Sequence, residues 1–128
     1  NTTFDLNPIA PSVYNATVAG GGLSDVSLDF GWCGAVNSTI CNVTNWSMTI
    51  ESAGTCVTGF EVLLGPASYT GSAITFQMWG GTDGFIAYVT VDCDPQGTHG
   101  TASLTGLVVN HPIYDYYFTF SSVHACAV

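Results

Sequence analysis

Apolar residues alternate with polar ones in five separate runs of the sequence, and this period of two limits the fold more than any other feature. Residues two apart lie on the same side of a β-strand, so each run predicts a strand with one apolar face. Helical periodicity is nearly absent. The apolar sets are Val26, Leu28, Phe30 and Trp32; Trp46, Met48 and Ile50; Ile74, Phe76 and Met78; Phe85, Ala87, Val89 and Val91; and Tyr114, Tyr116, Phe118 and Phe120.

Glycine, proline and aspartate separate these runs and are typical of turns. We expect turns at Gly20–Gly22, Gly65–Pro66, Gly80–Gly84 and Asp94–Gly97. Short strands spaced by turns predict an all-β sandwich or flattened barrel.

A chain of 128 residues has the length of one ordinary domain, and neither a repeat nor a linker interrupts it. We therefore predict a single domain over residues 1–128. Pro8 and Pro11 lack the N–H donor that a central strand needs, so residues 1–19 are expected to form an edge strand or an arm. The sequence also predicts a mature chain from which a secretory signal has been removed, because it lacks both a leader pattern and an apolar stretch of about 20 residues.

The sequence contains no lysine or arginine, against nine acidic residues and a net charge of −9. Lys and Arg hold nucleic acids and anionic membranes, so the composition argues against both partners and against phosphorylated ligands. Charged residues are only 7% of the chain, where about a quarter is usual. Glycans can supply the missing solvation, and sequons predict N-glycosylation at Asn1, Asn15, Asn37, Asn42 and Asn45.

Five cysteines predict disulfides and hence a secreted or luminal protein. Cys33, Cys41, Cys56, Cys93 and Cys126 show no CxxC spacing, which argues against zinc and thioredoxin-type chemistry. The number is odd, so one thiol is free, pairs with another chain, or has its partner elsewhere.

Four segments resemble the mannose 6-phosphate receptor homology domain over nearly the whole chain. Phe4–Ile9 resembles the family's opening Tyr-Asp-Leu-Ser-Pro-Leu, and Phe30–Gly34 resembles its early Asn-Val-Cys-Gly. Val89–Pro95 resembles the strand that ends in Phe-x-Cys-Asp-Pro. The most specific segment is Tyr116–Cys126, which resembles the closing Tyr-x-Phe-x-Trp-x-Thr-x-x-Ala-Cys.

The resemblance implies a flattened β-barrel or sandwich of two crossed, mainly antiparallel sheets. It also implies the disulfides Cys33–Cys41 and Cys93–Cys126. Three interpretations of Cys56 stay open: a bridge to one of these four cysteines, a covalent link to another chain, or a buried thiol.

Lectins of this family hold mannose with Gln, Arg, Glu and Tyr, and here only Tyr116 matches as a sugar contact. The other three positions fall on Val57, on Phe85 or Ile86, and on His111. Without the guanidinium donors of Arg, sugar recognition is weakened and phosphate recognition is nearly excluded. We expect the family's sugar site to be lost.

Other candidate chemistry is sparse. His99, His111 and His124 form no short ligand motif, and Asp92 and Asp94 are better explained by hydrogen bonds to turn amides than by Ca²⁺. Glu51 and Glu61 form no recognisable glycosidase pair, so we expect neither an enzyme nor a metal or cofactor.

Aromatic side chains pose a separate question, because they suit both a core and a sugar platform. The residues concerned are Trp32, Trp79, Tyr114, Tyr116 and Tyr117, of which Tyr114 and Tyr117 lie on opposite faces of their strand.

Three functional hypotheses remain from the sequence. The first is a structural subunit of an extracellular glycoprotein assembly or filament, in which residues 1–19 lie against a neighbour's sheet edge. The second is a lectin-like domain that binds neutral mannose-type glycans. The third is a luminal fragment of a sorting receptor. Expected partners are copies of the chain, other extracellular glycoproteins or glycans.

Overall fold

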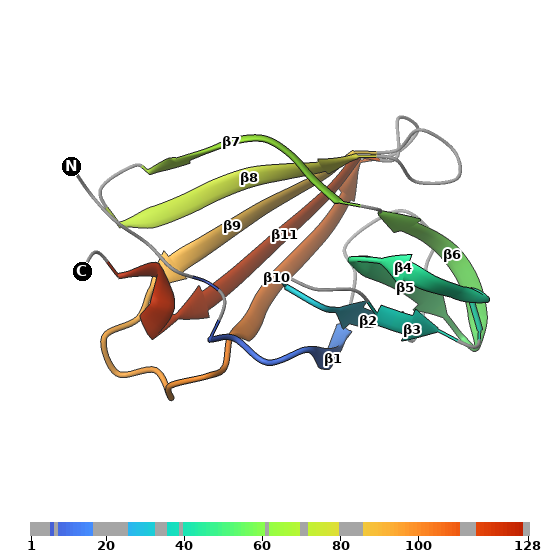
Figure 1. Cartoon of the computed structure of the whole chain (residues 1–128), viewed down its shortest axis with the longest axis horizontal. Coiled ribbons are helices and arrows are strands. Elements are labelled where there is room, and N and C mark those ends of the chain that lie inside the picture. Colours follow the sequence, from blue (N-terminus) through green and yellow to red (C-terminus); the bar gives the residue numbers. More distant parts are fainter. Residues whose placement is uncertain are drawn as a thin grey trace.

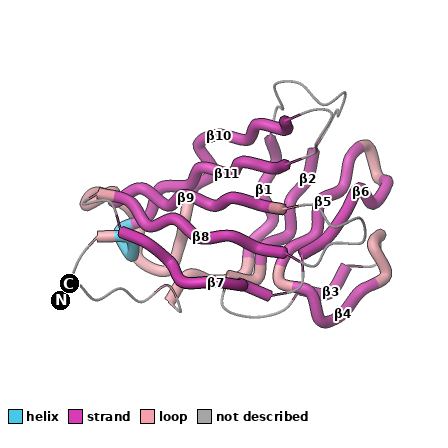
Figure 2. Tube along the Cα trace, turned by 90° about the horizontal axis from the view of Figure 1, so that it is seen from above, coloured by secondary structure: helices cyan, strands magenta, loops and turns pink. Residues whose placement is uncertain are grey.

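Two β-sheets lie against each other with their strands steeply crossed, as the computed structural model in Figures 1 and 2 shows. The sheets are not closed into a barrel, because their neighbouring edge strands form no ladder with each other. The all-β prediction is confirmed, with the sandwich rather than the barrel as its form. The structure describes residues 6, 8–16, 26–32, 36–38, 40–60, 62–69, 72–79, 86–110 and 115–126.

The smaller sheet is antiparallel throughout and has the strand order β1-β2-β5-β6. Its strands are β1 (Ser12–Ala16), β2 (Val26–Phe30), β5 (Met48–Ser52) and β6 (Thr55–Phe60). Its inward residues Val26, Leu28, Phe30, Met48, Ile50 and Phe60 are at most 1% exposed, which confirms the predicted alternation in β2. The turn between β5 and β6 uses Ala53 and Gly54, both with positive φ, as tight hairpins require.

The larger sheet has the strand order β10-β11-β9-β8-β7. Its strands are β7 (Val62–Tyr69), β8 (Ala73–Trp79), β9 (Ala87–Cys93), β10 (Ser103–Asn110) and β11 (Asp115–Ser122). Neighbours run antiparallel except β9 and β11, which are parallel with Phe118 opposite Val89. Strand β11 therefore lies between β9 and β10, although both precede it in the chain (Figure 1).

Aromatic side chains from both sheets fill the space between them. Phe30 and Phe60 of the smaller sheet, and Tyr116, Phe118 and Phe120 of the larger one, are at most 1% exposed. The ring centroids of Phe30 and Phe120 lie 5.7 Å apart, and those of Phe60 and Tyr116 lie 6.0 Å apart. Burying one such side chain contributes about 1.5–3 kcal/mol, so these contacts are the main force that joins the sheets.

Trp32 belongs to this core although its backbone leaves the strand. Its φ is 57°, a left-handed conformation that bulky residues seldom adopt. The indole stacks on Phe30 with centroids 4.3 Å apart, and its Nε1 donates a hydrogen bond of 3.1 Å to the Tyr14 hydroxyl. Because Trp32 is 7% exposed, it packs rather than serving as a sugar platform. The side chain of Trp79 and all of Tyr114 lie outside the described residues.

A short hairpin folds back over the outer face of the smaller sheet. It consists of β3 (Val36–Ser38) and β4 (Val43–Trp46). The Trp46 ring occupies the space that a Cβ on Gly59 would need, so the glycine is required for this close approach. Thr49, beside Gly59 in the register, points outward and is nevertheless 0% exposed.

The sequence predicts Trp46 on the same face as Met48 and Ile50, and this prediction is wrong. A bend at Ser47 separates β4 from β5, so the alternation does not continue through it. The bend turns the Trp46 ring to the outer face, while Met48 and Ile50 stay in the core.

Of the two disulfides that the resemblance implies, Cys93–Cys126 is present, with Cα atoms 4.5 Å apart. Parallel neighbours end at the same edge of a sheet, so β9 and β11 finish side by side. A 3₁₀ turn, η1 (Val123–Ala125), then carries Cys126 back to the end of β9.

The other implied disulfide is wrong, because Cys41 is bonded to Cys56 and not to Cys33. Cys41 lies at the tip of the β3–β4 hairpin, which folds onto β6 and brings the two Cα atoms within 4.9 Å. Cys56 is therefore neither a free thiol nor a link to another chain. By count Cys33 is the odd cysteine, and it lies outside the described residues.

Two of the predicted turns can be compared with the structure. At Asp94–Gly97 a turn is present, with the Gly97 amide donating to the Asp94 carbonyl oxygen at 3.0 Å. At Gly65–Pro66 the prediction is wrong, because these residues lie inside β7 at a shift of register between Leu64 and Ser68. An edge strand tolerates proline there, since its outer N–H groups need no ladder partner.

The N-terminal segment is an edge strand where the structure describes it. Ser12–Ala16 pair with β2 of the same chain, so this part is not a free arm. Among the described residues, no helix has the length and apolar character needed to cross a bilayer. The two disulfides are compatible with a secreted or luminal protein.

Candidate functional site: the outer face of the larger sheet

Exposed aromatic and apolar side chains form a straight row across four strands of the larger sheet. Tyr117 of β11 pairs in register with Tyr88 of β9 on one side and with Val108 of β10 on the other. Gln77 of β8 follows next to Tyr88. Val108 is 50% exposed and Tyr117 is 40% exposed. We call these four residues the tyrosine row.

The two tyrosine rings stack face to face, with centroids 4.8 Å apart and planes 10° apart. This distance is the strand spacing itself, so the rings stand upright on the sheet. Tyr117 has Tyr88 against one face of its ring and Val108 opposite it in the neighbouring strand. The row therefore presents mainly ring edges and hydroxyl groups to solvent.

A second row of small hydroxyl side chains runs beside the first, two residues along each strand. We call it the threonine row: Ser68 of β7, Thr75 of β8, Thr90 of β9 and Thr119 of β11. Ser68 and Thr75 share a hydrogen bond of 2.6 Å between their hydroxyl oxygens. Gly106 of β10 continues the row without a side chain. Together the two rows make a flat, uncharged strip.

Carboxylates flank this strip on its two long sides and do not lie within it. Asp115 precedes Tyr117 by two residues on β11, and Asp92 follows Thr90 by two residues on β9. Desolvation raises the pKa of the Tyr88 hydroxyl, and the negative charge of Asp115 and the neighbouring Tyr117 raise it further. Tyr88 is therefore neutral at physiological pH, since even the ordinary pKa of tyrosine is about 10.

Four of the five sequons lie on β1 or on the β3–β4 hairpin and not on the larger sheet. Asn15 on β1 and Asn42 at the tip of the β3–β4 hairpin are both exposed, so oligosaccharyltransferase could reach them. Asn37 and Asn45 belong to the same hairpin, although their side chains lie outside the described residues, as does Asn1. After residue 47 the sequence contains no sequon, so all of the larger sheet is free of them.

A pair of carboxyl groups lies on the outer face of the smaller sheet, partly under the hairpin. Glu51 is 5% exposed and accepts a hydrogen bond of 2.9 Å from the Thr49 hydroxyl. Burial raises the pKa of Glu51; the hydrogen bond from Thr49 lowers it, and the charge of Asp29 raises it. Burial also raises the pKa of Asp29. Glu61, the other half of the glycosidase pair considered from sequence, lies outside the described residues.

The one matched sugar contact, Tyr116, lies in the core. It is 1% exposed, and its ring packs edge-on against Phe60 and in parallel with Phe118. A sugar at the surface cannot reach this ring, so the assignment of Tyr116 as a sugar contact is corrected. The exposed tyrosine of β11 is its neighbour Tyr117, which points to the opposite face.

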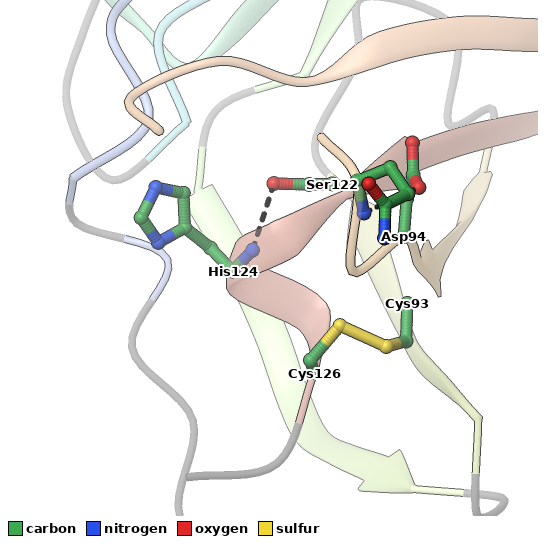
Figure 3. Close-up of a disulfide and its surroundings, with 6 residues drawn as sticks. Cys93, Asp94, Ser122, His124 and Cys126 are labelled. Atoms are coloured by element: carbon green, nitrogen blue, oxygen red, sulfur yellow. Dashed lines mark hydrogen bonds between the residues drawn. A yellow bond between two sulfur atoms is a disulfide. The ribbon is translucent and has the colours of Figure 1, made fainter. Parts of the chain in front are cut away.

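Ser122 at the end of β11 and His124 in η1 could suggest a nucleophile and its base, but their hydrogen bonds are to the backbone. The Ser122 hydroxyl donates to the Thr101 carbonyl at 2.9 Å. It also accepts from the His124 amide at 3.1 Å, the contact drawn as a dashed line in Figure 3. The His124 imidazole accepts from the Gly100 amide through Nε2 at 2.8 Å. His99 packs edge-on against it, with centroids 5.5 Å apart. These contacts fix the loop between β9 and β10 onto the C-terminal turn.

Asp94, beside the Cys93–Cys126 disulfide in Figure 3, accepts a hydrogen bond of 3.0 Å from the Gln96 amide. This is the turn-amide contact expected from sequence. No group of three or more His, Cys, Asp or Glu residues suited to a metal ion occurs in the part of the chain that the structure describes. His111 lies outside that part.

No protein-family model matches the sequence, and no curated protein matches it either. The structure defines the class of the protein as a disulfide-bonded all-β sandwich domain, and its function has to be argued from its surfaces.

Proposed function

We propose that this chain is a non-enzymatic extracellular glycoprotein domain that serves as a structural subunit of an assembly. One observation carries the proposal: the two outer faces of the sandwich differ in kind. The β1 edge and the hairpin carry four of the five sequons, whereas the larger sheet exposes the tyrosine row and has no sequon. A face free of glycans and lined by tyrosine is suited to contact with another protein.

The low charge of the chain supports the same proposal. With no lysine or arginine, the domain cannot bind its partners through the cationic patches that hold nucleic acids or anionic lipids. Uncharged hydroxyl, amide and aromatic groups remain as the means of contact. N-linked glycans on the opposite side would keep such an assembly hydrated.

Descent from the mannose 6-phosphate receptor homology domain is part of the proposal. The crossed sheets and the Cys93–Cys126 bridge are what the resemblance implies, and they support it. The Cys41–Cys56 bridge departs from the pattern. The buried Tyr116 argues against retention of the family's sugar site, so the lectin function is not favoured.

The molar mass of the native glycoprotein tests the proposal directly. Light scattering over a wide concentration range, with electron micrographs of the same fractions, should show a large and regular assembly. A monodisperse monomer at every concentration would overturn the structural function.

Glycosylation can be tested separately by mass spectrometry before and after enzymatic removal of N-glycans. We expect the mass to fall on treatment, and the Asn15→Gln and Asn42→Gln variants each to lose one glycan. An untreated chain with the mass of the bare polypeptide would contradict this part of the proposal.

A further inference from the structure

The flat strip on the larger sheet has the chemistry of a surface that can pair with itself. Every polar group in its two rows is a hydroxyl or an amide: Tyr88, Tyr117 and Gln77 in the tyrosine row, and the serine and threonines beside them. Hydroxyls and amides both donate and accept hydrogen bonds, whereas carboxylates only accept. A copy of this strip can therefore satisfy the hydrogen bonds of another copy, which a carboxylate surface cannot do.

The position of the charged residues is compatible with a second copy of the chain as the partner. The chain carries a net charge of −9, so two copies repel each other unless their carboxylates are kept apart. The centre of the strip contains no charged side chain, and Asp92 and Asp115 flank it. Contact through the centre leaves these carboxylates at the rim, where salt screens charges over a Debye length of about 8 Å at physiological ionic strength.

The ring geometry favours a flat protein surface over a sugar. Carbohydrates stack on the open face of an aromatic ring, but the ring faces of the tyrosine row are turned toward neighbours in the row. The upright rings and Val108 instead form a low ridge beside the small side chains of the threonine row. A ridge beside a shallow row is a shape that a two-fold related copy can complement.

We infer that the tyrosine row and the threonine row form a face-to-face contact between two copies of this chain. The inference rests on the proposed function and names the surface through which the assembly forms. Val108 and Tyr117, the most exposed apolar residues of the strip, supply its main apolar contacts. Asp92 and Asp115 lie at its rim.

Sedimentation velocity of the glycosylated full chain over a range of concentrations tests the inference. Tyr117→Ser and Val108→Thr should each weaken association at least about tenfold, the effect of losing one main apolar contact. The matched control is Val13→Thr, because Val13 is 63% exposed on the smaller sheet, away from the strip. The control should associate as the wild type does.

The salt dependence of association distinguishes a second copy of the chain from a partner of opposite charge. Repulsion between like-charged copies is screened by salt, so self-association should strengthen as sodium chloride rises. Association that weakens with salt would overturn the inference, because it would indicate contact between opposite charges.

Further outcomes separate the inference from the proposed function. If the chain assembles but Tyr117→Ser and Val108→Thr have no effect, the strip is not the contact and the structural function stands. If the wild type is monomeric throughout, both fall. A monomer that retains neutral oligosaccharides on an array through Tyr117 would assign the strip to sugar binding instead. Thermal unfolding of both variants close to that of the wild type excludes a folding defect.

Discussion

The two sheets of the sandwich share one core, but only the smaller sheet has its outer face covered by another part of the described chain. On the smaller sheet the β3–β4 hairpin lies over β5 and β6, is bonded to β6 through Cys41–Cys56, and leaves Thr49 fully buried. On the larger sheet the equivalent face exposes Val108 and Tyr117. The difference shows that one face is completed by the chain's own hairpin, whereas the other leaves apolar side chains exposed.

Removing the Cys41–Cys56 bridge should have the largest effect on this comparison. The double substitution Cys41→Ala with Cys56→Ala opens a link across a sequence separation of 15. Such a loop predicts a loss of about 3 kcal/mol in the free energy of unfolding. Guanidinium titration measures the loss, and hydrogen exchange at the β5 amides shows whether the hairpin lifts off. Unchanged hydrogen exchange would mean that the packing of Trp46 on Gly59 is enough to keep the β3–β4 hairpin on the sheet.

Replacing one glycine by alanine on each outer face tests whether only the smaller sheet is covered. Gly59→Ala places a Cβ where the Trp46 ring lies, and overpacking of this kind costs about 1–3 kcal/mol. Gly106→Ala on the larger sheet meets Thr119 at 3.8 Å, an ordinary contact. Because glycine is weaker than alanine in a strand by roughly 0.5–1 kcal/mol, this control should be neutral or stabilising. Equal losses in both variants would show that the hairpin does not cover its face.

The tyrosine pair should contribute little to folding even if it is central to assembly. A cross-strand pair of side chains is worth about 0.2–1 kcal/mol, so Tyr88→Thr should lower the free energy of unfolding by no more than that. Chemical denaturation of dilute, monomeric protein measures this value. A loss of several kcal/mol would identify the pair as a structural element and would weaken the contrast between the two faces.

The smallest expected effect is the pH dependence of stability that comes from the carboxyl groups on the outer face of the smaller sheet. Burial holds the pKa of Glu51 and of Asp29 above the ordinary value, so the folded state binds protons more tightly than the unfolded state. The contribution of these groups to stability is therefore greatest below the unfolded pKa of about 4 and is lost as the pH rises through the folded pKa. Glu51→Gln, whose amide oxygen can still accept from Thr49, should melt higher than the wild type near neutral pH. The difference should close near about pH 4, and a variant that melts lower at both values would contradict this account.

Most of the inner face could be predicted from sequence, because alternation depends only on the strand itself. The buried sets in β2, β8, β9 and β11 follow the predicted pattern. The failures occur where the backbone departs from regular geometry: the bend at Ser47, the register shift around Gly65 and Pro66, and the β5–β6 turn with Ala53 at a positive φ of 50°. Alanine rarely adopts that conformation, so only Gly54 indicated a turn at this place.

Most of the candidate site could not be predicted from the sequence, because it depends on which strands are neighbours in the sheet. Alternation places Tyr88 and Tyr117 on the outer face of their strands, and this much could be read from the sequence. Their stacking requires β9 and β11 to be parallel and in register, which no local pattern reveals. For the same reason a bridge at Cys56 could only be left open as one of three alternatives, since the Cys41–Cys56 pairing follows from the folding of the hairpin onto β6.

The insertion of β11 between β9 and β10 has a consequence for the order of folding. On a ribosome, β9 and β10 emerge first but share no ladder, so neither β10 nor the Cys93–Cys126 bridge can reach its final state until Asp115–Ser122 arrive. Contacts between residues so far apart in the chain form slowly. Until then the apolar inner faces of β9 and β10 are unprotected, so this half of the molecule is open to aggregation for longer than the half formed by β2, β5 and β6.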